Sequence, residues 1–338
     1  MLNLIVANRK KVTFIRANSA SSSHILNYKS KPPKDISSKS WVIFNVHTMQ
    51  IIYGKKHHYP REIASLTKIM TCYLTLTLTK KLNLPLMELT VRVSKLAASM
   101  IGTSANLKEG DQLKLIDLLY GLMLPSGNDA AFILGEALGC LLYYDFNNRS
   151  RIYELIHGKM ICVMSEPVVE PLKYFLNEMN KTAKELKLYN TTFANPHGLM
   201  NRYNRSTASD VAKLSCFALK LPLFLQIVNT KHYECVIKNY KNNSSRKEVW
   251  FNTNKLLDKG FFGVKTGITD TAGPCLVTSL RSHNLKKDIW AVCVILNCRT
   301  MEKRWTECEE LLTWGLKEIS LRNEESGMFA TPRNLIHN

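Results

Sequence analysis

Ser65 and Lys68 lie three residues apart in the stretch ASLTKIMT, immediately before a long apolar run. Residues with this spacing share one face of a helix, so a serine in the first turn and a lysine one turn later can touch. If burial or a neighbouring cation keeps the amine neutral, the lysine can accept the serine's proton and turn the serine into a nucleophile. The alternative is that both are ordinary polar residues at the start of a helix.

A second Ser-x-x-Lys pattern, at Ser244 and Lys247, lies in the stretch KNNSSRKE. The polar composition of that stretch predicts a solvated loop without chemistry. The pattern alone is therefore not diagnostic, and only its surroundings separate the two copies.

Ser126 and Asn128 form a Ser-x-Asn pattern in the stretch LPSGND, between two predicted helices. The flanking proline and the glycine can shape a rigid loop that presents both side chains to a cleft. Ordinary capping of the following helix is the alternative. The same pattern occurs twice more, at Ser104/Asn106 and Ser282/Asn284.

Lys265, Thr266 and Gly267 form a third pattern, at the end of the predicted strand GFFGVKTG. A cation, a hydroxyl donor and a residue without a side chain on an edge strand could hold the carboxylate and backbone of an extended substrate. A strand that runs into a turn is the alternative for the triplet by itself. The order Ser-x-x-Lys, Ser-x-Asn, Lys-Thr-Gly is that of the penicillin-interactive serine enzymes.

These patterns need a scaffold that brings distant parts of the chain together. Apolar runs at 41–46 and 49–54 predict a β-hairpin, and β-rich runs return from about residue 231 onward. Strands at both ends of a helical middle predict an α/β sandwich in which the first hairpin joins the later strands in one sheet. Helices are predicted at 65–82, 113–124, 128–139 (closed by Gly139), 171–188, 207–221 and 303–319.

The net charge of +19 is uneven, because residues 1–40 hold eight Lys or Arg and a single acidic residue. No basic helix, zinc-finger spacing or aromatic-basic signature accompanies the charge, so specific nucleic-acid binding is not expected. The charge supports only non-specific attraction to polyanions, and an acidic polymer such as a cell wall fits it as well as a nucleic acid does. The nine cysteines are scattered without a C-x-x-C, which favours free thiols and predicts neither a metal site nor a cofactor. No apolar run reaches 18 residues, so no transmembrane segment is expected.

The chain resembles the D-alanyl-D-alanine carboxypeptidases, the low-molecular-weight penicillin-binding proteins of peptidase family S11. The resemblance implies an α/β fold of the β-lactamase/transpeptidase type, an antiparallel sheet flanked by helices with a helical subdomain. It also implies a serine hydrolase that removes the terminal D-alanine from peptidoglycan stem peptides ending in D-Ala-D-Ala, with β-lactams as inhibitors. Seven collinear segments between about residues 41 and 319 carry it: IASLTKIMT, GTSANLKEGDQLKLIDLLYGLMLPSGNDAA, FLNEMNKTAKELKLYNTTFANPHGL, STASDVAKLS, NTNKLL, GVKTGITDTAG and RTMEKRWTECEELLTWGL.

The resemblance also implies a role for each motif residue. Ser65 would be the nucleophile and Lys68 its general base. Ser126 would pass a proton toward the leaving D-alanine, and Asn128 would bind the substrate amide. Lys265 would supply the positive potential that keeps the base neutral.

Further residues would bind the end of the substrate. Thr266 and Arg304 would hold the terminal carboxylate, with Arg299 as a competitor for the second role. Gly267 would let the substrate backbone lie close to the strand. The backbone N–H of Ile268 would form the oxyanion hole together with that of the nucleophile.

The chain is expected to divide into a basic, disordered leader (1–39), a catalytic domain (40–320) with an insertion at about 140–170, and a C-terminal tail (321–338). After residue 320 neither a β-rich second domain nor an amphipathic anchoring helix is expected, although many relatives carry one. The leader is rich in serine, and its charges follow its short apolar stretch, which is a poor secretory signal and a passable transit peptide. The family usually works outside the cytoplasm, and the compartment of this chain stays open.

Three alternatives share part of this evidence. A β-lactamase needs a carboxylate to activate the deacylating water, and no E-x-x-L-N occurs in the chain. An esterase or amidase could keep the machinery and take a different substrate because of the insertion. A catalytically silent peptidoglycan-binding protein would have no need of Lys68. His197, in the stretch NPHGL, is expected to mark a shaped turn and not a catalytic acid.

Overall fold

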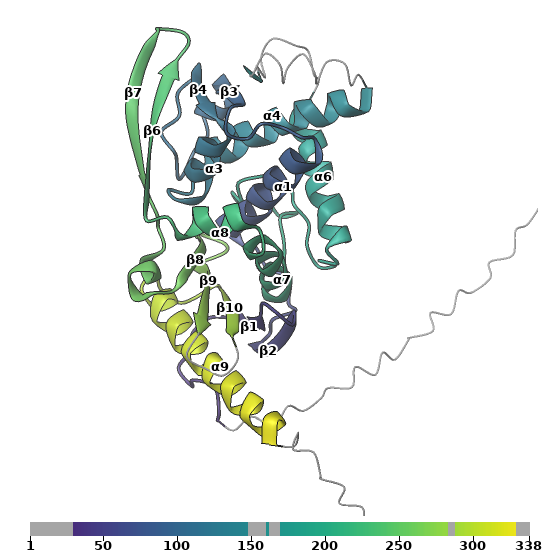
Figure 1. The fold of residues 1–338 in the computed structure, drawn as a ribbon, viewed down its shortest axis with the longest axis vertical. Helices are drawn as coiled ribbons and strands as arrows, with labels where there is room; N and C mark the ends of the chain where they lie inside the picture. Colours follow the sequence, from purple (N-terminus) through teal and green to yellow (C-terminus); the bar gives the residue numbers. More distant parts are fainter. Residues whose placement is uncertain (1–29, 148–159, 162–169, 283–287, 329–338) are drawn as a thin grey trace, which may run out of the picture.

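The structure, a computed structural model, describes residues 30–147, 160–161, 170–282 and 288–328 (Figure 1). The first of its sheets has the strand order β2-β1-β10-β9-β8, and every neighbouring pair is antiparallel. The N-terminal hairpin therefore joins the C-terminal strands in one sheet, as the sequence predicted. The strands are β1 (Ser40–Asn45), β2 (Gln50–Lys55), β8 (Phe262–Gly267), β9 (Cys275–Ser282) and β10 (Ile289–Leu296).

Helices cover both faces of this sheet. Every residue of β10 is buried, and its successive side chains point to opposite faces, as in any strand. Val292 and Val294 belong to the core shared with the helical part of the molecule. Cys293 and Ile295 belong to a second core that the sheet shares with α9 (Lys303–Met328).

The helical part is built around α1 (Lys68–Lys81), which contacts most of the helices near it. Most residues of α1 are buried, including several threonines. Thr71 and Thr75 donate their hydroxyl hydrogen bonds to backbone carbonyls, which satisfies these polar groups inside the core. The surrounding helices are α2 (Lys95–Ala98), α3 (Leu115–Met123), α4 (Asn128–Asn147), α6 (Pro171–Glu185), α7 (Ala208–Leu219) and α8 (Pro222–Asn229).

A second sheet, of order β5-β3-β4-β6-β7, lies beside the helices and was not predicted. The stretch KNNSSRKE, predicted as a loop, forms the turn and the start of β7. The prediction failed because the start of this hairpin strand is exposed to solvent, so its polar composition resembles that of a loop. The expectation that all late strands join the first sheet is wrong for β6 and β7. The strands are β3 (Thr90–Arg92), β4 (Asp111–Lys114), β5 (Met160–Ile161), β6 (His232–Asn239) and β7 (Ser244–Phe251).

Gly139 does not end its helix, contrary to the prediction. α4 continues to Asn147, so the first residues assigned to the insertion are helical. A Cβ atom at Gly139 would lie 1.9 Å from the carbonyl oxygen of Pro171, where α6 begins. The glycine therefore permits the close contact between α4 and α6 and has no role as a cap. Most of the remaining predicted insertion lies outside the described residues.

The boundary predicted for the leader, at residue 39, is also wrong. Residues 30–39 run along α9, where Ser37 and Ser38 donate backbone and side-chain hydrogen bonds to the buried Glu307 carboxylate. Ser30 does the same for Glu318. Residues 30–39 thus belong to the folded domain, and the rest of the predicted leader lies outside the described residues.

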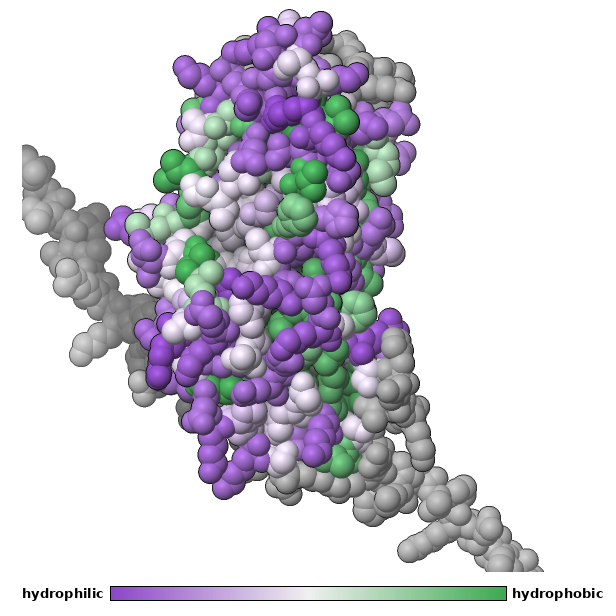
Figure 2. Space-filling view, turned by 90° about the vertical axis from the view of Figure 1, so that its left-hand side faces the viewer, coloured by the Kyte–Doolittle hydropathy of each residue, from purple (hydrophilic) through white to green (hydrophobic). Residues whose placement is uncertain are grey.

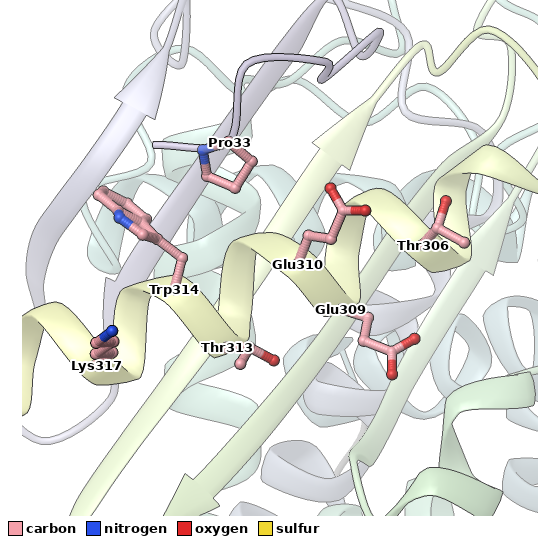
Figure 3. Close-up of a pocket in the computed structure, with 7 residues that line it drawn as sticks. All are labelled: Pro33, Thr306, Glu309, Glu310, Thr313, Trp314 and Lys317. Carbon is pink, nitrogen blue, oxygen red and sulfur yellow. The ribbon is translucent and has the colours of Figure 1, made fainter. Parts of the chain in front are cut away.

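The N-terminal segment and α9 border a shallow groove, in which Pro33 and Trp314 lie close to each other (Figure 3). None of the residues that line the groove belongs to the three motifs. They are Pro33, Thr306, Glu309, Glu310, Thr313, Trp314 and Lys317.

Eight of the nine cysteines lie in the described part of the chain, and all eight are free thiols, as predicted. Cys162 lies outside it. No single helix in the described ranges has the length and hydropathy of a membrane span; only α7 and α8 taken together pass, and they meet at 106°. Seen from the side on which the β6–β7 hairpin lies, the surface is mostly hydrophilic, with hydrophobic residues in separate patches (Figure 2).

Replacing Glu307 by alanine should lower the free energy of unfolding by about 2 kcal/mol, the scale of hydrogen bonds to a charged group. Burial favours the neutral acid, but the hydrogen bonds from Ser37 and Ser38 outweigh burial and lower the pKa of Glu307 below its ordinary value of 4.5. The stabilisation is therefore present above pH 4.5 and is lost as pH falls through the lower pKa of the folded state.

Urea unfolding of wild type and variant at pH 7 and pH 3 measures this difference. The exposed Glu310 on the same helix provides the control, and Glu310→Ala should change stability little. A Glu307→Ala effect that is the same at both pH values would contradict the account.

Candidate active site

Ser65 lies in a 3-10 turn, η1 (Ala64–Thr67), that runs directly into α1. The sequence predicted one continuous helix. The tighter first turn brings the Ser65 hydroxyl 2.9 Å from the Lys68 amine. Just before the serine, Ala64 has a φ of +48°, a left-handed conformation that is unusual for a residue with a side chain. Strained backbone of this kind concentrates at functional sites.

The Lys68 amine is completely buried and has three partners. Besides the Ser65 hydroxyl, they are the Asn128 side-chain oxygen at 2.6 Å and the His197 carbonyl at 2.8 Å. A neutral amine has two N–H donors and one lone pair. The amide and carbonyl oxygens can only accept, so they take both donors, and the lone pair is left for the proton of the serine.

The electrostatics favour the same neutral state. Burial lowers the pKa of Lys68 well below its ordinary value, and the positive charge of Lys265 lowers it further. Asp129 opposes the shift without reversing it. The amine that contacts Ser65 is thus suited to accept a proton. A neutral lysine was the condition for this chemistry, and it depends on burial and neighbouring charge, which the sequence alone does not give.

Ser126 occupies the loop between α3 and α4, with a φ of +66°. Its side-chain oxygen is buried and has no hydrogen-bond partner among the described residues. The loop is held by Asp129, whose carboxylate accepts hydrogen bonds from the backbone of Ala105 and Leu107 and from the Ser104 hydroxyl. The Ser-x-Asn copy that begins at Ser104 therefore supports the loop of Ser126.

Lys265, Thr266 and Gly267 end β8, the edge strand of the first sheet. The Lys265 amine is buried, and burial together with the charge of Arg304 lowers its pKa to about 7. A Cβ atom at Gly267 would lie 3.1 Å from the Ser65 backbone nitrogen. The edge strand therefore passes directly beside Ser65, the predicted nucleophile.

Arg304, and not Arg299, reaches this strand. Arg304 is 5% exposed, and its guanidinium donates to the Gly267 carbonyl at 3.4 Å, whereas Arg299 is exposed. The Nε atom of Arg304 is buried without a partner in the described part of the chain. Ile268, the residue after the strand, is 48% exposed.

His197 contributes its backbone to the site. Its carbonyl accepts from Lys68, and its ring nitrogen Nδ1 accepts from the Leu199 N–H at 3.1 Å. Burial, aided by Lys68, lowers the pKa of His197 to about 3, so the ring is neutral and shapes the turn, in agreement with the prediction. Gly198 has a φ of +87°, and a Cβ atom there would lie 2.0 Å from the Ala64 carbonyl.

Two groups at the site were not predicted. The His197 carbonyl is a backbone atom, for which a sequence carries no signal. The Thr253 hydroxyl lies 2.8 Å from that of Thr266 and comes from the NTNKLL segment, which showed the family resemblance without indicating a role. Within the described ranges, no cluster of three or more His, Cys, Asp or Glu side chains could hold a metal ion.

The family model described as D-alanyl-D-alanine carboxypeptidase matches residues 27–140 and 162–300. The carboxypeptidase DacF of Bacillus subtilis (strain 168) is 30% identical over 284 residues, which is 83% of this chain and 62% of DacF. The D-alanyl-D-alanine carboxypeptidase of Streptomyces sp. (strain K15) is 31% identical over 239 residues, 69% of this chain and 72% of that protein. The chain thus spans less than two thirds of the length of DacF.

Solved structures show the same relationship. The crystal structure of the Streptomyces K15 DD-transpeptidase matches with a TM-score of 0.72 and 28% identity, and the match covers 85% of this chain and 100% of that chain. The carboxypeptidase DacD from Francisella tularensis matches with a TM-score of 0.68 and 25% identity, over 85% of this chain and 72% of the other. The predicted fold is confirmed.

Replacing Gly198 by alanine should lower the free energy of unfolding by about 3 kcal/mol, because the new Cβ would displace the backbone before Ser65. Gly260 is a matched control, since its φ of +82° is similar but a Cβ there would meet nothing within 4 Å. Gly260→Ala should cost only the conformational strain, about 1 kcal/mol. Urea unfolding measures both, and equal losses would refute the importance of the close contact.

Proposed function

The chain belongs to the D-alanyl-D-alanine carboxypeptidase family, peptidase S11, and from this membership we propose that it removes the C-terminal D-alanine from peptidoglycan stem peptides ending in D-Ala-D-Ala. The reaction is that of a serine hydrolase that passes through an acyl-enzyme. The observation that carries the proposal is the completely buried Lys68 amine, which has the Ser65 hydroxyl among its three hydrogen-bond partners.

Acylation begins when Ser65 Oγ attacks the carbonyl carbon between the two D-alanines. Neutral Lys68 takes the serine proton as the new C–O bond forms. The carbonyl oxygen becomes an oxyanion, held by the backbone N–H groups of Ser65 and Ile268. The position of Gly267 beside the Ser65 nitrogen supports this assignment, because it leaves room for the substrate backbone there.

Ser126 passes a proton to the departing nitrogen and is reprotonated by Lys68, which gives up the proton that it took from Ser65 and is neutral again. The C–N bond then breaks, D-alanine leaves, and the acyl group remains on Ser65 as an ester. The unpartnered, buried hydroxyl of Ser126 supports this role, because its hydrogen-bonding capacity is free for the reacting groups. Water hydrolyses the ester with Lys68 again as the base, which returns the enzyme to its starting state.

Asn128 and the cations bind the substrate. Asn128 Nδ2 donates one proton to the Ile101 carbonyl, and its second proton is left to bind the substrate amide carbonyl. The terminal carboxylate meets Thr266 and Arg304, with Lys265 nearby as a further positive charge. The unpartnered Nε atom of Arg304 supports a role in binding an anion.

Other functions fit less well. A silent peptidoglycan-binding protein would gain nothing from a buried amine beside a serine, whereas burying an amine costs free energy of folding in any protein. A β-lactamase would need a carboxylate to activate water, and the lack of E-x-x-L-N in the sequence argues against a class A β-lactamase. An esterase or amidase with the same machinery would differ only in the substrate accepted. β-Lactams, which carry a strained amide and a carboxylate, are the expected inhibitors.

Transfer of the acyl group to an amine is a second candidate reaction, because the similar Streptomyces K15 structure is that of a DD-transpeptidase. The acyl-enzyme is common to both reactions, and only the attacking group differs. Supplying a D-amino acid together with the peptide substrate separates them, since transfer produces an exchanged peptide and hydrolysis a shortened one.

Labelling of the full chain with a fluorescent penicillin, followed by intact mass and peptide mapping, tests the nucleophile. We expect a covalent adduct on Ser65 that persists for minutes, no adduct with Ser65→Ala, and release of D-alanine from a peptide ending in D-Ala-D-Ala. Ser244→Ala is the control within the same chain, since Ser244 has the same Ser-x-x-Lys spacing on an exposed strand. That variant should label normally.

Rapid turnover of the penicillin would identify a β-lactamase instead. An adduct without release of D-alanine from any peptide would favour an esterase or amidase. A folded chain that forms no adduct and releases no D-alanine would indicate a catalytically silent peptidoglycan-binding protein.

The pH dependence of kcat/KM should be bell-shaped. Activity should fall at low pH, as Lys68 becomes protonated and can no longer accept the serine proton. It should also fall as pH rises above about 7, because Lys265 then loses the charge that attracts the substrate carboxylate. Lys265→Arg should be less active but should lack the upper limb, because arginine stays charged. An unchanged upper limb in this variant would assign the limb to another group.

A further inference from the structure

Thr253 is a second hydroxyl at the carboxylate end of the candidate site. Its Oγ1 atom lies 2.8 Å from Oγ1 of Thr266, and either atom can be the donor. Thr253 is solvent-exposed, whereas Thr266 is buried. The first therefore lies on the open side of the second, where a substrate has to enter.

The backbone around Thr253 is held in place from both sides. The Asn252 side chain donates to the carbonyls of Val228 and Thr230, at the end of α8. The Asn254 side chain accepts from the Leu256 N–H and caps the turn that follows. The Thr253 N–H itself donates to the Leu124 carbonyl, two residues before Ser126. Thr253 is thus fixed between the Ser126 loop and β8.

When a carboxylate is bound, the number of available protons decides which of the two threonine hydroxyls donates the hydrogen bond between them. The Thr266 hydroxyl has one proton, and a carboxylate beside it can only accept a hydrogen bond. Thr266 must then donate to the substrate, so the bond between the two threonines requires Thr253 as donor. A hydroxyl that accepts one hydrogen bond donates a stronger one, because the two bonds polarise each other.

We propose that Thr253 is a positioning residue for the substrate carboxylate, which acts by directing the Thr266 hydroxyl proton toward it. This inference rests on the proposed function, since it needs a substrate with a terminal carboxylate. Thr253 itself need not touch the reacting atoms. Its removal should weaken binding of a carboxylate and leave the chemistry at Ser65 intact.

Two thioester substrates that differ only in the carboxylate provide the test. One is an N-acyl-D-alanyl thioglycolate, and the other is its methyl ester, which has the same leaving sulfur and no charge. Thr253→Val should lower kcat/KM for the thioglycolate about tenfold, mainly through KM, because the variant loses the hydrogen bond between the two hydroxyls and the strengthening that this bond gives to the one from Thr266 to the carboxylate. The kcat/KM for the methyl ester should change less than twofold. Thr253→Ser, which keeps the hydroxyl, should restore the kcat/KM for the thioglycolate.

The ratio of the two substrates within one preparation does not depend on how much of the variant is folded. Thr266→Val should lower the same ratio, and adding Thr253→Val to it should change little more, because the two hydroxyls act in series. Thr313→Val, on the exposed side of α9, is the control and should leave the ratio unchanged.

Equal losses on both substrates would mean that Thr253 has only a structural role, and no loss on either would mean that Thr266 needs no help; both results overturn the inference. A wild-type chain that hydrolyses neither thioester nor any peptide ending in D-Ala-D-Ala overturns the proposed function, and this inference with it. An active wild type with an unaffected Thr253→Val overturns only the inference.

Discussion

The site depends on keeping one amine buried and uncharged. Lys68 can have the proposed role of base for Ser65 only if the protein surrounds it with groups that accept hydrogen bonds from its two N–H groups and leave its lone pair toward the serine. Those groups come from distant parts of the chain, Asn128 at the start of α4 and the His197 carbonyl. A misplaced acceptor would leave a polar group without a hydrogen bond inside the core, which costs stability. The packing that stabilises α1 therefore also sets the geometry of the site.

Close backbone contacts put the separate parts of this site in register. Gly198 lets its turn lie against the backbone before Ser65, and Gly267 lets β8 pass beside the nitrogen of Ser65 itself. Gly139 does the same for α4 and α6, at a distance from the motifs. At each of these positions a methyl group would push two segments apart. The glycines therefore allow the short distances between backbone segments on which the geometry of the site depends.

The N-terminal segment contributes to the site through α9. Ser37 and Ser38 bind the Glu307 carboxylate, and Glu307 follows Arg304 by three residues on the first turn of that helix. Residues with this spacing share a helix face, so the contact that holds the segment also holds the turn from which Arg304 reaches Gly267. A stretch whose composition resembles a leader thus helps to fix Arg304, the cation on α9 that contacts the edge strand.

The sequence by itself determined which residue types are present and in what order, and this was enough for the three motifs, the family, the central helices and the joining of the first hairpin to the last strands. The tertiary structure decided which copies of the motifs are brought together. Ser244 and Lys247 have the spacing of Ser65 and Lys68, but on a strand residues three apart point to opposite faces, so they cannot act as a pair. The choice of Arg304 over Arg299, the carbonyl of His197 and the role of Gly139 follow from contacts between segments far apart in the chain. Local spacing is written in the sequence, whereas burial and contact between distant segments exist only after the chain has folded.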